Sequence, residues 1–169
     1  MIPTIRQHPR SRCVFSASCA WGLIPYGAKD PSIGLKTINA MSETAAVKPV
    51  FRDAFKYRRC LIPADGFYEW KNLGPKQKQA YNFGTLDGSV FAFAGLWERW
   101  RQPDQTILET CAILTTPPNS LVAEVHDRMP AILHEEDYER WLDPGITDPQ
   151  RVTMTMKSVR RKSHRTALL

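Results

Sequence analysis

Glu69 is the residue of this sequence best placed to do chemistry. It lies in the run Arg-Arg-Cys-Leu-Ile-Pro-Ala-Asp-Gly-Phe-Tyr-Glu-Trp, which covers residues 58–70. Acids are rare in such strand-like, aromatic runs unless they are paired or functional. Burial among aromatic rings would raise the proton affinity of this carboxyl, which suits general acid or base catalysis. The alternative is that Glu69 is the solvent-facing member of an alternating strand, and this stretch alone leaves both open.

A second group of reactive residues occurs in Val-His-Asp-Arg-Met-Pro, residues 125–130. The pattern before proline is typical of a loop. His126 is a candidate proton shuttle or phosphate donor, because imidazole titrates near neutral pH. A single loop histidine is more often ordinary polar surface, so this motif has two interpretations as well.

Two further sets of residues are candidates. Asn39 and Glu43 lie between a strand-like stretch and a helix-like one, where Asn39 is either functional or a turn or cap residue. Trp70, Trp97 and Trp100 lie near arginines and could stack on nucleic-acid bases. Aromatic residues in strands are more often part of the core.

The composition is that of an ordinary globular domain. The chain has 169 residues, of which 43% are apolar and 24% charged, and we predict one domain over residues 1–169. It has no apolar run long enough to span a membrane. Its N-terminus is polar and basic, without the apolar stretch of a secretory signal, so we expect no signal peptide. Its four cysteines lack metal-binding or disulfide spacing, so we expect reduced thiols in a cytoplasmic protein, without metal or cofactor.

The net charge of +6 favours an anionic partner, most commonly nucleic acid. Much of the excess lies between Lys157 and Arg165, which is either a phosphate-binding tail or a solvated terminus.

The expected elements alternate between strands and short helices. We predict strands at 21–24, 60–62, 66–71, 81–85, 90–96 and 107–115, and helices at 44–57 (interrupted at Pro49), 119–124 and 135–142. Asp87-Gly88 predicts a hairpin between the strands at 81–85 and 90–96. Because strands dominate the middle of the chain, we expect an α+β fold: a mainly antiparallel, barrel-like sheet with peripheral helices.

Taken together and in this order, the motifs resemble the SOS response-associated peptidase (SRAP) family, the abasic-site processing proteins. The resemblance covers the whole chain. It rests on Trp-Gly-Leu-Ile-Pro (21–25), Ala-Lys-Asp (28–30), Asn-Ala-x-x-Glu-Thr (39–44), Phe-Arg (51–52), the 58–70 run, Phe-Ala-Gly-Leu-Trp (93–97), Thr-Thr-x-x-Asn (115–119) and His-Asp-Arg-Met-Pro (126–130).

This resemblance implies a reaction. Family members recognise an abasic site in single-stranded DNA, and the amine and thiol of an N-terminal cysteine form a covalent thiazolidine crosslink with the sugar aldehyde. An autoproteolytic peptidase activity is associated with the same residues. By the same resemblance, Asn39 orients the nucleophile, Glu69 transfers protons, His126 acts on the sugar oxygen, Arg128 holds a phosphate and Trp70 packs against a base.

The same resemblance adds Arg58 and Arg59 to the DNA contacts. It also implies a nucleoid-associated location in the cytoplasm and a role in the response to DNA damage.

The chain departs from the family pattern at its start. It begins Met1-Ile2, and the family's first strand with its nucleophilic cysteine is expected to be absent, so that the domain is truncated. Cys13 and Cys19 cannot replace that cysteine, because an internal residue has no free α-amine. Met41 stands where the family usually has arginine, and Gly27 where it usually has an aromatic residue.

Three functional hypotheses follow. The first is an abasic-site crosslinking protein whose true N-terminus lies upstream. The second is a relative without catalytic activity that binds single-stranded DNA non-covalently. The third is a thiol hydrolase that uses Cys60 with His126, although Cys60 in an apolar strand is more often a core thiol.

Overall fold

The protein, described by a computed structural model over residues 1–154 and 163–167, is built mainly of strands. The elements in chain order are β1 (Ile2–Gln7), β2 (Val14–Trp21), η1 (Pro31–Lys36), β3 (Asn39–Met41), α1 (Ser42–Ala45), α2 (Arg52–Tyr57), β4 (Arg59–Ala64), β5 (Gly66–Gly74), β6 (Gln77–Thr85), β7 (Phe91–Arg101), β8 (Ile107–Thr116), β9 (Met129–Pro130), β10 (Ile132–Leu133), η2 (Glu135–Asp137), α3 (Tyr138–Leu142), α4 (Pro149–Met154) and β11 (Ser163–Ala167).

Five strands close into a barrel in the order β7, β4, β1, β2 and β8, with β8 pairing back to β7. The neighbours are antiparallel except β2 and β8, which run parallel with Ala20 beside Thr110. Gly95 of β7 lies against Cys60 of β4, and only glycine fits there. A Cβ at this position would lie 2.8 Å from the sulfur of Cys60. This confirms the expected α+β fold with a mainly antiparallel, barrel-like sheet.

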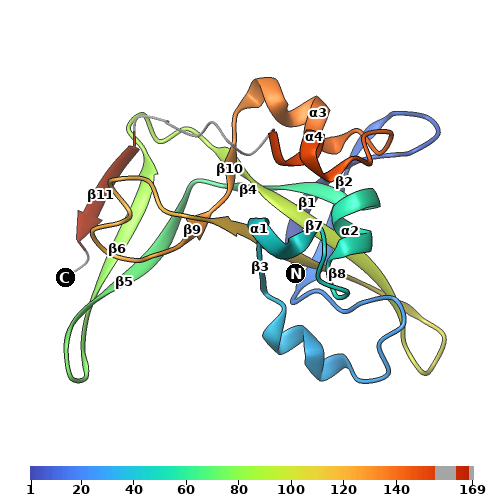
Figure 1. Ribbon diagram of the computed structural model, residues 1–169, viewed down its shortest axis with the longest axis horizontal. Coiled ribbons are helices and arrows are strands. Elements are labelled where there is room, and N and C mark those ends of the chain that lie inside the picture. The colour runs from blue at the N-terminus through green and yellow to red at the C-terminus, as the bar shows by residue number, and fades with distance from the viewer. Residues whose placement is uncertain (155–162, 168–169) are drawn as a thin grey trace.

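The alternation of side chains along the strands separates two apolar clusters. One cluster includes Leu61 and Leu114 and packs against the helices, where the rings of Phe55 and Trp141 meet edge to face. The helices α2, α3 and α4 lie together on one side of the sheet (Figure 1). The other cluster includes Cys60, Cys111 and Ile113.

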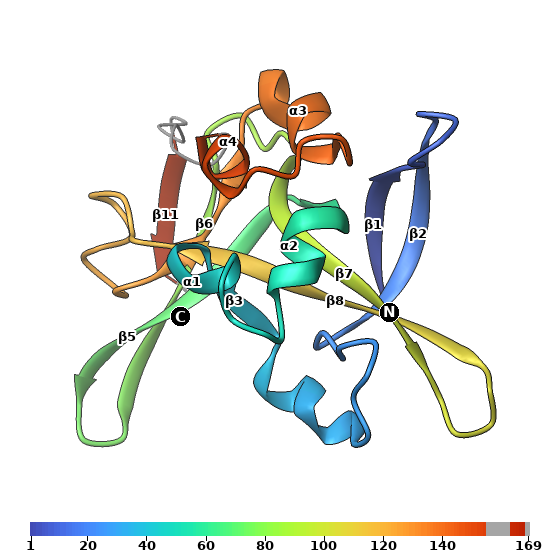
Figure 2. The same ribbon diagram turned by 45° about the vertical axis from the view of Figure 1, so that its right-hand side comes forward.

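A second, three-stranded sheet of β5, β6 and β11 stands beside the barrel, and the β5–β6 hairpin extends away from it (Figure 2). Phe67 of β5 joins the two sheets, because its ring stacks on Phe83 at 5.2 Å and meets Phe93 of the barrel edge to face. The residues carried by β5 are therefore held against the barrel.

The expected hairpin between 81–85 and 90–96 is wrong, although both segments are strands. β6 pairs with β5 and β11, whereas β7 pairs with β4, β8 and β10. The Asp87-Gly88 turn does form, with Gly88 at φ 71°, but it connects the two sheets. The Asp87-Gly88 signal specifies only the local turn, and it does not specify which strands pair. β6 and β7 therefore pair with other strands and not with each other.

Two other predicted elements are also wrong. Residues 119–124 form successive turns, although Asn119 Oδ1 accepts hydrogen bonds from the backbone N–H groups of Leu121 and Val122, as a helix cap would. The strand expected at 21–24 ends at Trp21, because Gly22 adopts φ 117° and approaches the backbone of Gly34 too closely for any side chain.

The other predicted elements are confirmed with shifted ends. The helix interrupted at Pro49 is α1 followed by α2, and the helix at 135–142 is η2 followed by α3. The predicted basic tail from Lys157 falls largely outside the described residues.

Candidate functional site

Glu69 and His126, 57 residues apart in the sequence, lie close together where the small sheet meets the barrel sheet. Glu69 is carried by β5, and His126 by the loop that leads into β9. Glu69 Oε2 is 3.9 Å from His126 Nδ1, and their side chains are 20% and 42% exposed. Asp127 Oδ1 lies 3.3 Å from the same nitrogen. The two residues predicted for proton transfer therefore form a half-buried carboxyl–imidazole pair.

The surroundings of this pair suit proton transfer. Burial raises the pKa of Glu69, the charge of Asp127 raises it further, and the charge of His126 opposes both. His126 Nδ1 also lies 3.1 Å from both the backbone nitrogen and the backbone oxygen of Arg128. The neutral ring accepts from that N–H, and the protonated ring can donate to that carbonyl, so the loop supports both protonation states.

Asn39 begins β3, where it pairs with Ile113 of β8. Its side chain is exposed, as is that of Met41, whereas Ala40 between them is buried. Within the described part of the chain, no hydrogen bond joins Asn39 to Glu69 or His126. The structure thus places Asn39 on β3 of the barrel sheet, where its backbone pairs with β8.

Arg128 pairs with Glu43, a carboxylate for which the sequence indicated no role. Its two terminal nitrogens donate to Glu43 Oε1 and Oε2 at 2.8 and 2.9 Å, and Nη2 also donates to the carbonyl of Thr115 at 2.7 Å. The arginine pairing lowers the pKa of Glu43. The sequence signal for Glu43 was its place in the motif, four residues after Asn39. The motif did not indicate Arg128 as its partner, because the two residues are 85 positions apart.

Arg58 and Arg59, both predicted to contact DNA, have other partners. Arg58 forms an ion pair with Glu98 at 2.6 Å. Arg59 is 4% exposed, and its guanidinium donates to the backbone carbonyls of Phe55, Lys56, Trp141 and Asp143. Burial lowers the pKa of Arg59 to about 10, so it remains charged at neutral pH. This buried position does not fit contact with DNA. Arg59 instead links the C-terminal ends of α2 and α3.

The tryptophans divide between the surface and the core. Trp70 is exposed, but neighbouring residues of a strand point to opposite faces, so it projects away from Glu69. Trp100 is buried and donates to the carbonyl of Ala28, whereas Trp97 packs under the guanidinium of Arg6. Trp21, not selected from the sequence, is exposed, and its indole donates to the carbonyl of Ile38, next to Asn39.

Cys60 is a core thiol. It is fully buried in the cluster with Cys111, and burial raises the pKa of its thiol far above the usual range. A nucleophilic cysteine needs an accessible thiolate, so the thiol-hydrolase hypothesis has no support from this geometry.

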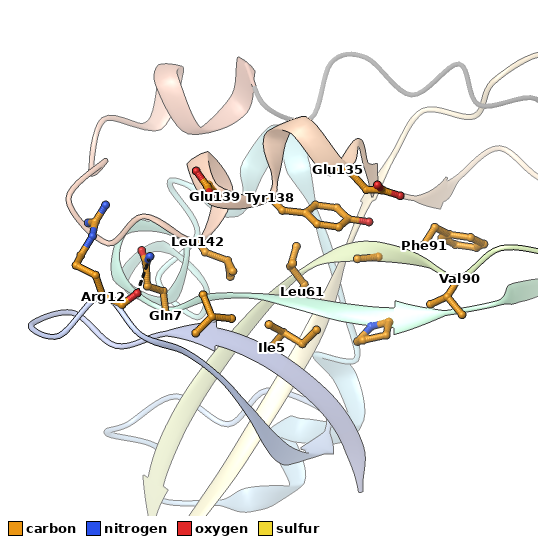
Figure 3. A pocket seen from close by; sticks show the side chains of 13 residues that line it. Ile5, Gln7, Arg12, Leu61, Val90, Phe91, Glu135, Tyr138, Glu139 and Leu142 are labelled. Atoms are coloured by element: carbon orange, nitrogen blue, oxygen red, sulfur yellow. Dashed lines mark hydrogen bonds between the residues drawn. The ribbon is translucent and has the colours of Figure 1, made fainter.

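Two cavities bear on the choice of site. One, of about 390 Å³, lies beside Glu43 and is lined also by Ser42 and residues 116–119. The other, of about 480 Å³, lies between the β1–β2 hairpin and α3, with an apolar floor that includes Ile5 and Leu61 (Figure 3). Neither cavity is lined by Asn39, Glu69 or His126, so we place the site at the Glu69–His126 contact; the first cavity includes Glu43, the partner of Arg128.

The described residues contain no cluster of three or more histidine, cysteine or acidic side chains arranged to hold a metal ion. Over the same residues, every helix is too short to cross a membrane.

Fold and site together define a mixed-barrel α+β protein with a carboxyl–imidazole pair and an arginine–carboxylate pair beside it. The chain belongs to the SOS response associated peptidase (SRAP) family, whose family model matches residues 1–167. This confirms the resemblance seen in the sequence.

Relatives and solved structures agree with this assignment. Abasic site processing protein YoqW of Bacillus subtilis is 52% identical over 129 residues, which are 76% of this chain and 58% of that protein. Abasic site processing protein HMCES of Xenopus tropicalis is 32% identical over 76% of this chain and 45% of its own length. The chain thus spans about half the length of these relatives, 58% of the first and 45% of the second. A crystal structure of a Bacteroides thetaiotaomicron protein superposes with a TM-score of 0.83 at 30% identity, covering 98% of this chain and 73% of that one.

Proposed function

We propose that this chain processes abasic sites in single-stranded DNA, with Glu69 and His126 transferring protons during covalent capture of the sugar. The observation that carries the proposal is their 3.9 Å approach, with Arg128 two residues beyond His126. The names of the relatives and the net charge of +6 support a DNA substrate.

The proposed chemistry needs no redox cofactor. An amine adds to the aldehyde of the ring-opened sugar, water leaves, and an imine forms; a thiol then adds to the imine carbon and closes a thiazolidine. Glu69 takes the proton from the attacking amine and returns it to the departing hydroxyl, which a carboxyl with a raised pKa does well near neutral pH. His126 exchanges a proton with the ring oxygen of the sugar, and Asn39 orients the amine.

The strand is held by Arg128 through a phosphate and by Trp70 through a stacked base. Within this proposal the protein acts at the nucleoid in the response to DNA damage, and the family's peptidase activity would use the same pair. The aminothiol that this chemistry requires is provided, for the test, by an added N-terminal segment that carries a cysteine.

The test joins a segment with a processed N-terminal cysteine to this chain and offers it single-stranded DNA with one abasic site. We expect a crosslink that survives denaturing electrophoresis, and none from the chain as printed. Glu69→Gln or His126→Ala should slow formation or reversal by roughly tens- to thousands-fold. Glu136→Gln, an exposed carboxylate change on η2, is the matched control.

Full activity of both variants would contradict the assigned roles. A second candidate, non-covalent binding alone, would be favoured if the extended protein prefers single-stranded over duplex DNA, with affinity that falls as salt rises, yet never forms the crosslink.

A further inference from the structure

The Glu43–Arg128 pair is built across the end of a strand. β3 and β9 flank β8 on opposite sides, so that Met41, Thr115 and Pro130 form one row. Glu43 follows Met41 by two residues and Arg128 precedes Pro130 by two, so both reach the point where β8 ends at Thr116. The pair therefore ties the corner that carries Asn39 to the loop that carries His126.

This contact fixes the plane of the guanidinium. The bidentate arrangement with Glu43 uses one N–H of each terminal nitrogen, and the carbonyl of Thr115 takes the second N–H of Nη2. Arg128 Nε is buried, and no group in the described ranges accepts from it. One N–H of Nη1 is left. The side chain is 22% exposed. Since Nε is buried, we take this remaining N–H as the donor that an incoming phosphate would reach.

Two effects of Glu43 on DNA binding have opposite signs. Its negative charge repels phosphate, so a purely electrostatic role predicts that removing it tightens binding. Its bidentate contact holds a flexible side chain in one orientation, so a positioning role predicts that removing it weakens binding, because the ordering of Arg128 must then occur on binding. The extensive contacts favour the second effect.

We infer that Glu43 is a positioning residue that holds Arg128 ready for a backbone phosphate of the bound strand. The inference rests on the proposed function, in which Arg128 contacts DNA. It assigns Glu43 no contact with the reacting sugar. The pairing persists when DNA binds, and the single outward N–H of Nη1 takes the phosphate.

The first experiment measures affinity for a labelled single strand that contains a tetrahydrofuran abasic analogue, over a series of salt concentrations. Arg128→Ala should weaken binding by about tenfold and reduce the salt slope by about one. Glu43→Ala should weaken it by roughly five- to tenfold, and Glu43→Gln, which keeps the shape but loses the charge, should lie between Glu43→Ala and wild type.

The double variant Glu43→Ala/Arg128→Ala should bind no more weakly than Arg128→Ala, because positioning without an arginine has no effect. Glu136→Gln removes the same charge away from the pair and should leave affinity within about twofold. Thermal melts of each variant show whether the fold is kept. Tighter binding by Glu43→Ala, unchanged binding, or additive losses in the double variant would each overturn the inference.

A second experiment does not depend on DNA. In ¹⁵N spectra of the free protein, the Arg128 terminal N–H groups should give separate, slowly exchanging signals that Glu43→Ala abolishes. If these signals are absent from wild type, the inference fails whatever the DNA result. If they are present but the protein shows no preference for single-stranded DNA, the proposed function fails while the pairing stands.

Discussion

Two arginines that the sequence predicted as DNA contacts, Arg59 and Arg128, have opposite surroundings. Arg59 is 4% exposed and donates to four backbone carbonyls, two of them at the C-terminal end of α2. Arg128 is 22% exposed, pairs with the carboxylate of Glu43 and donates to a single backbone carbonyl, that of Thr115. The difference shows that the burial of the guanidinium among backbone carbonyls, more than its charge, separates an arginine that stabilises the fold from one that can bind a ligand.

The largest effect should come from Arg59→Met. Removing the guanidinium leaves buried carbonyls of Phe55 and Trp141 without donors, so the free energy of unfolding should fall by about 3–4 kcal/mol. Arg128→Met should lower it by less than about 1 kcal/mol. Urea denaturation of both variants measures this, and equal losses would remove the distinction between the two arginines.

Trp70→Ala tests whether exposure also separates functional from structural aromatic residues. Trp70 is exposed whereas Trp100 is buried, so its removal should leave the melting temperature nearly unchanged. Affinity for single-stranded DNA should fall about fivefold, near the low end of base stacking because the ring points away from Glu69. Anisotropy titration measures this, and an unchanged affinity would take Trp70 out of the proposed contact.

Arg128→Lys asks whether charge or geometry matters at the solvent-facing arginine. Lysine keeps the positive charge but lacks the planar guanidinium that binds Glu43 through two hydrogen bonds. Affinity for single-stranded DNA should therefore fall about threefold, while its dependence on salt concentration stays the same. The same salt series measures both values. A lost salt dependence would mean that the lysine no longer reaches phosphate, and wild-type affinity would make the planar guanidinium irrelevant.

The smallest expected effect is the change in stability caused by Glu69→Gln. The raised pKa of Glu69 means that the folded state holds this proton more tightly than the unfolded chain, so the stabilisation is present below the ordinary pKa of 4.5 and is lost as pH rises through the raised value. Glu69→Gln should therefore be slightly more stable than wild type at neutral pH, with the advantage vanishing toward pH 4. Thermal melts across this range measure the difference, and a variant less stable at neutral pH would contradict the burial argument.

The fold was predictable where local signals agree with the tertiary pairing. The predictions at 60–62 and 107–115 located β4 and β8, and Pro49 correctly marked the break between α1 and α2. The Asp87-Gly88 turn misled because turn chemistry does not specify which strands pair. The partners of β6 and β7 depend on packing such as that of Phe67 against Phe83, which joins distant segments.

The sequence supplied candidate residues for the site but not their arrangement, and their roles stay predictions. Glu69 and His126 were chosen separately, from two different motifs, and the structure brings them within 3.9 Å of each other. The adjacent arginines at 58 and 59 looked equivalent, because a sequence does not show which of two neighbours on a strand faces inward. Glu43 was noted without a partner, because its 85-residue separation from Arg128 leaves no periodic signal.

The parallel pairing of β2 with β8 has a consequence for how the chain folds. It brings Ala20 beside Thr110, and β3 docks Asn39 beside Ile113 on the same strand. Pairing β2 or β3 with the distant β8 closes a long loop, which costs chain entropy before stabilising contacts form. The β7–β8 hairpin closes only a short loop. We expect barrel closure to be a late kinetic step, with the strand that carries Asn39 docking on β8 after the hairpin is complete. Asn39 and the Glu43–Arg128 contact that follows it would then reach their final positions only at the end of folding.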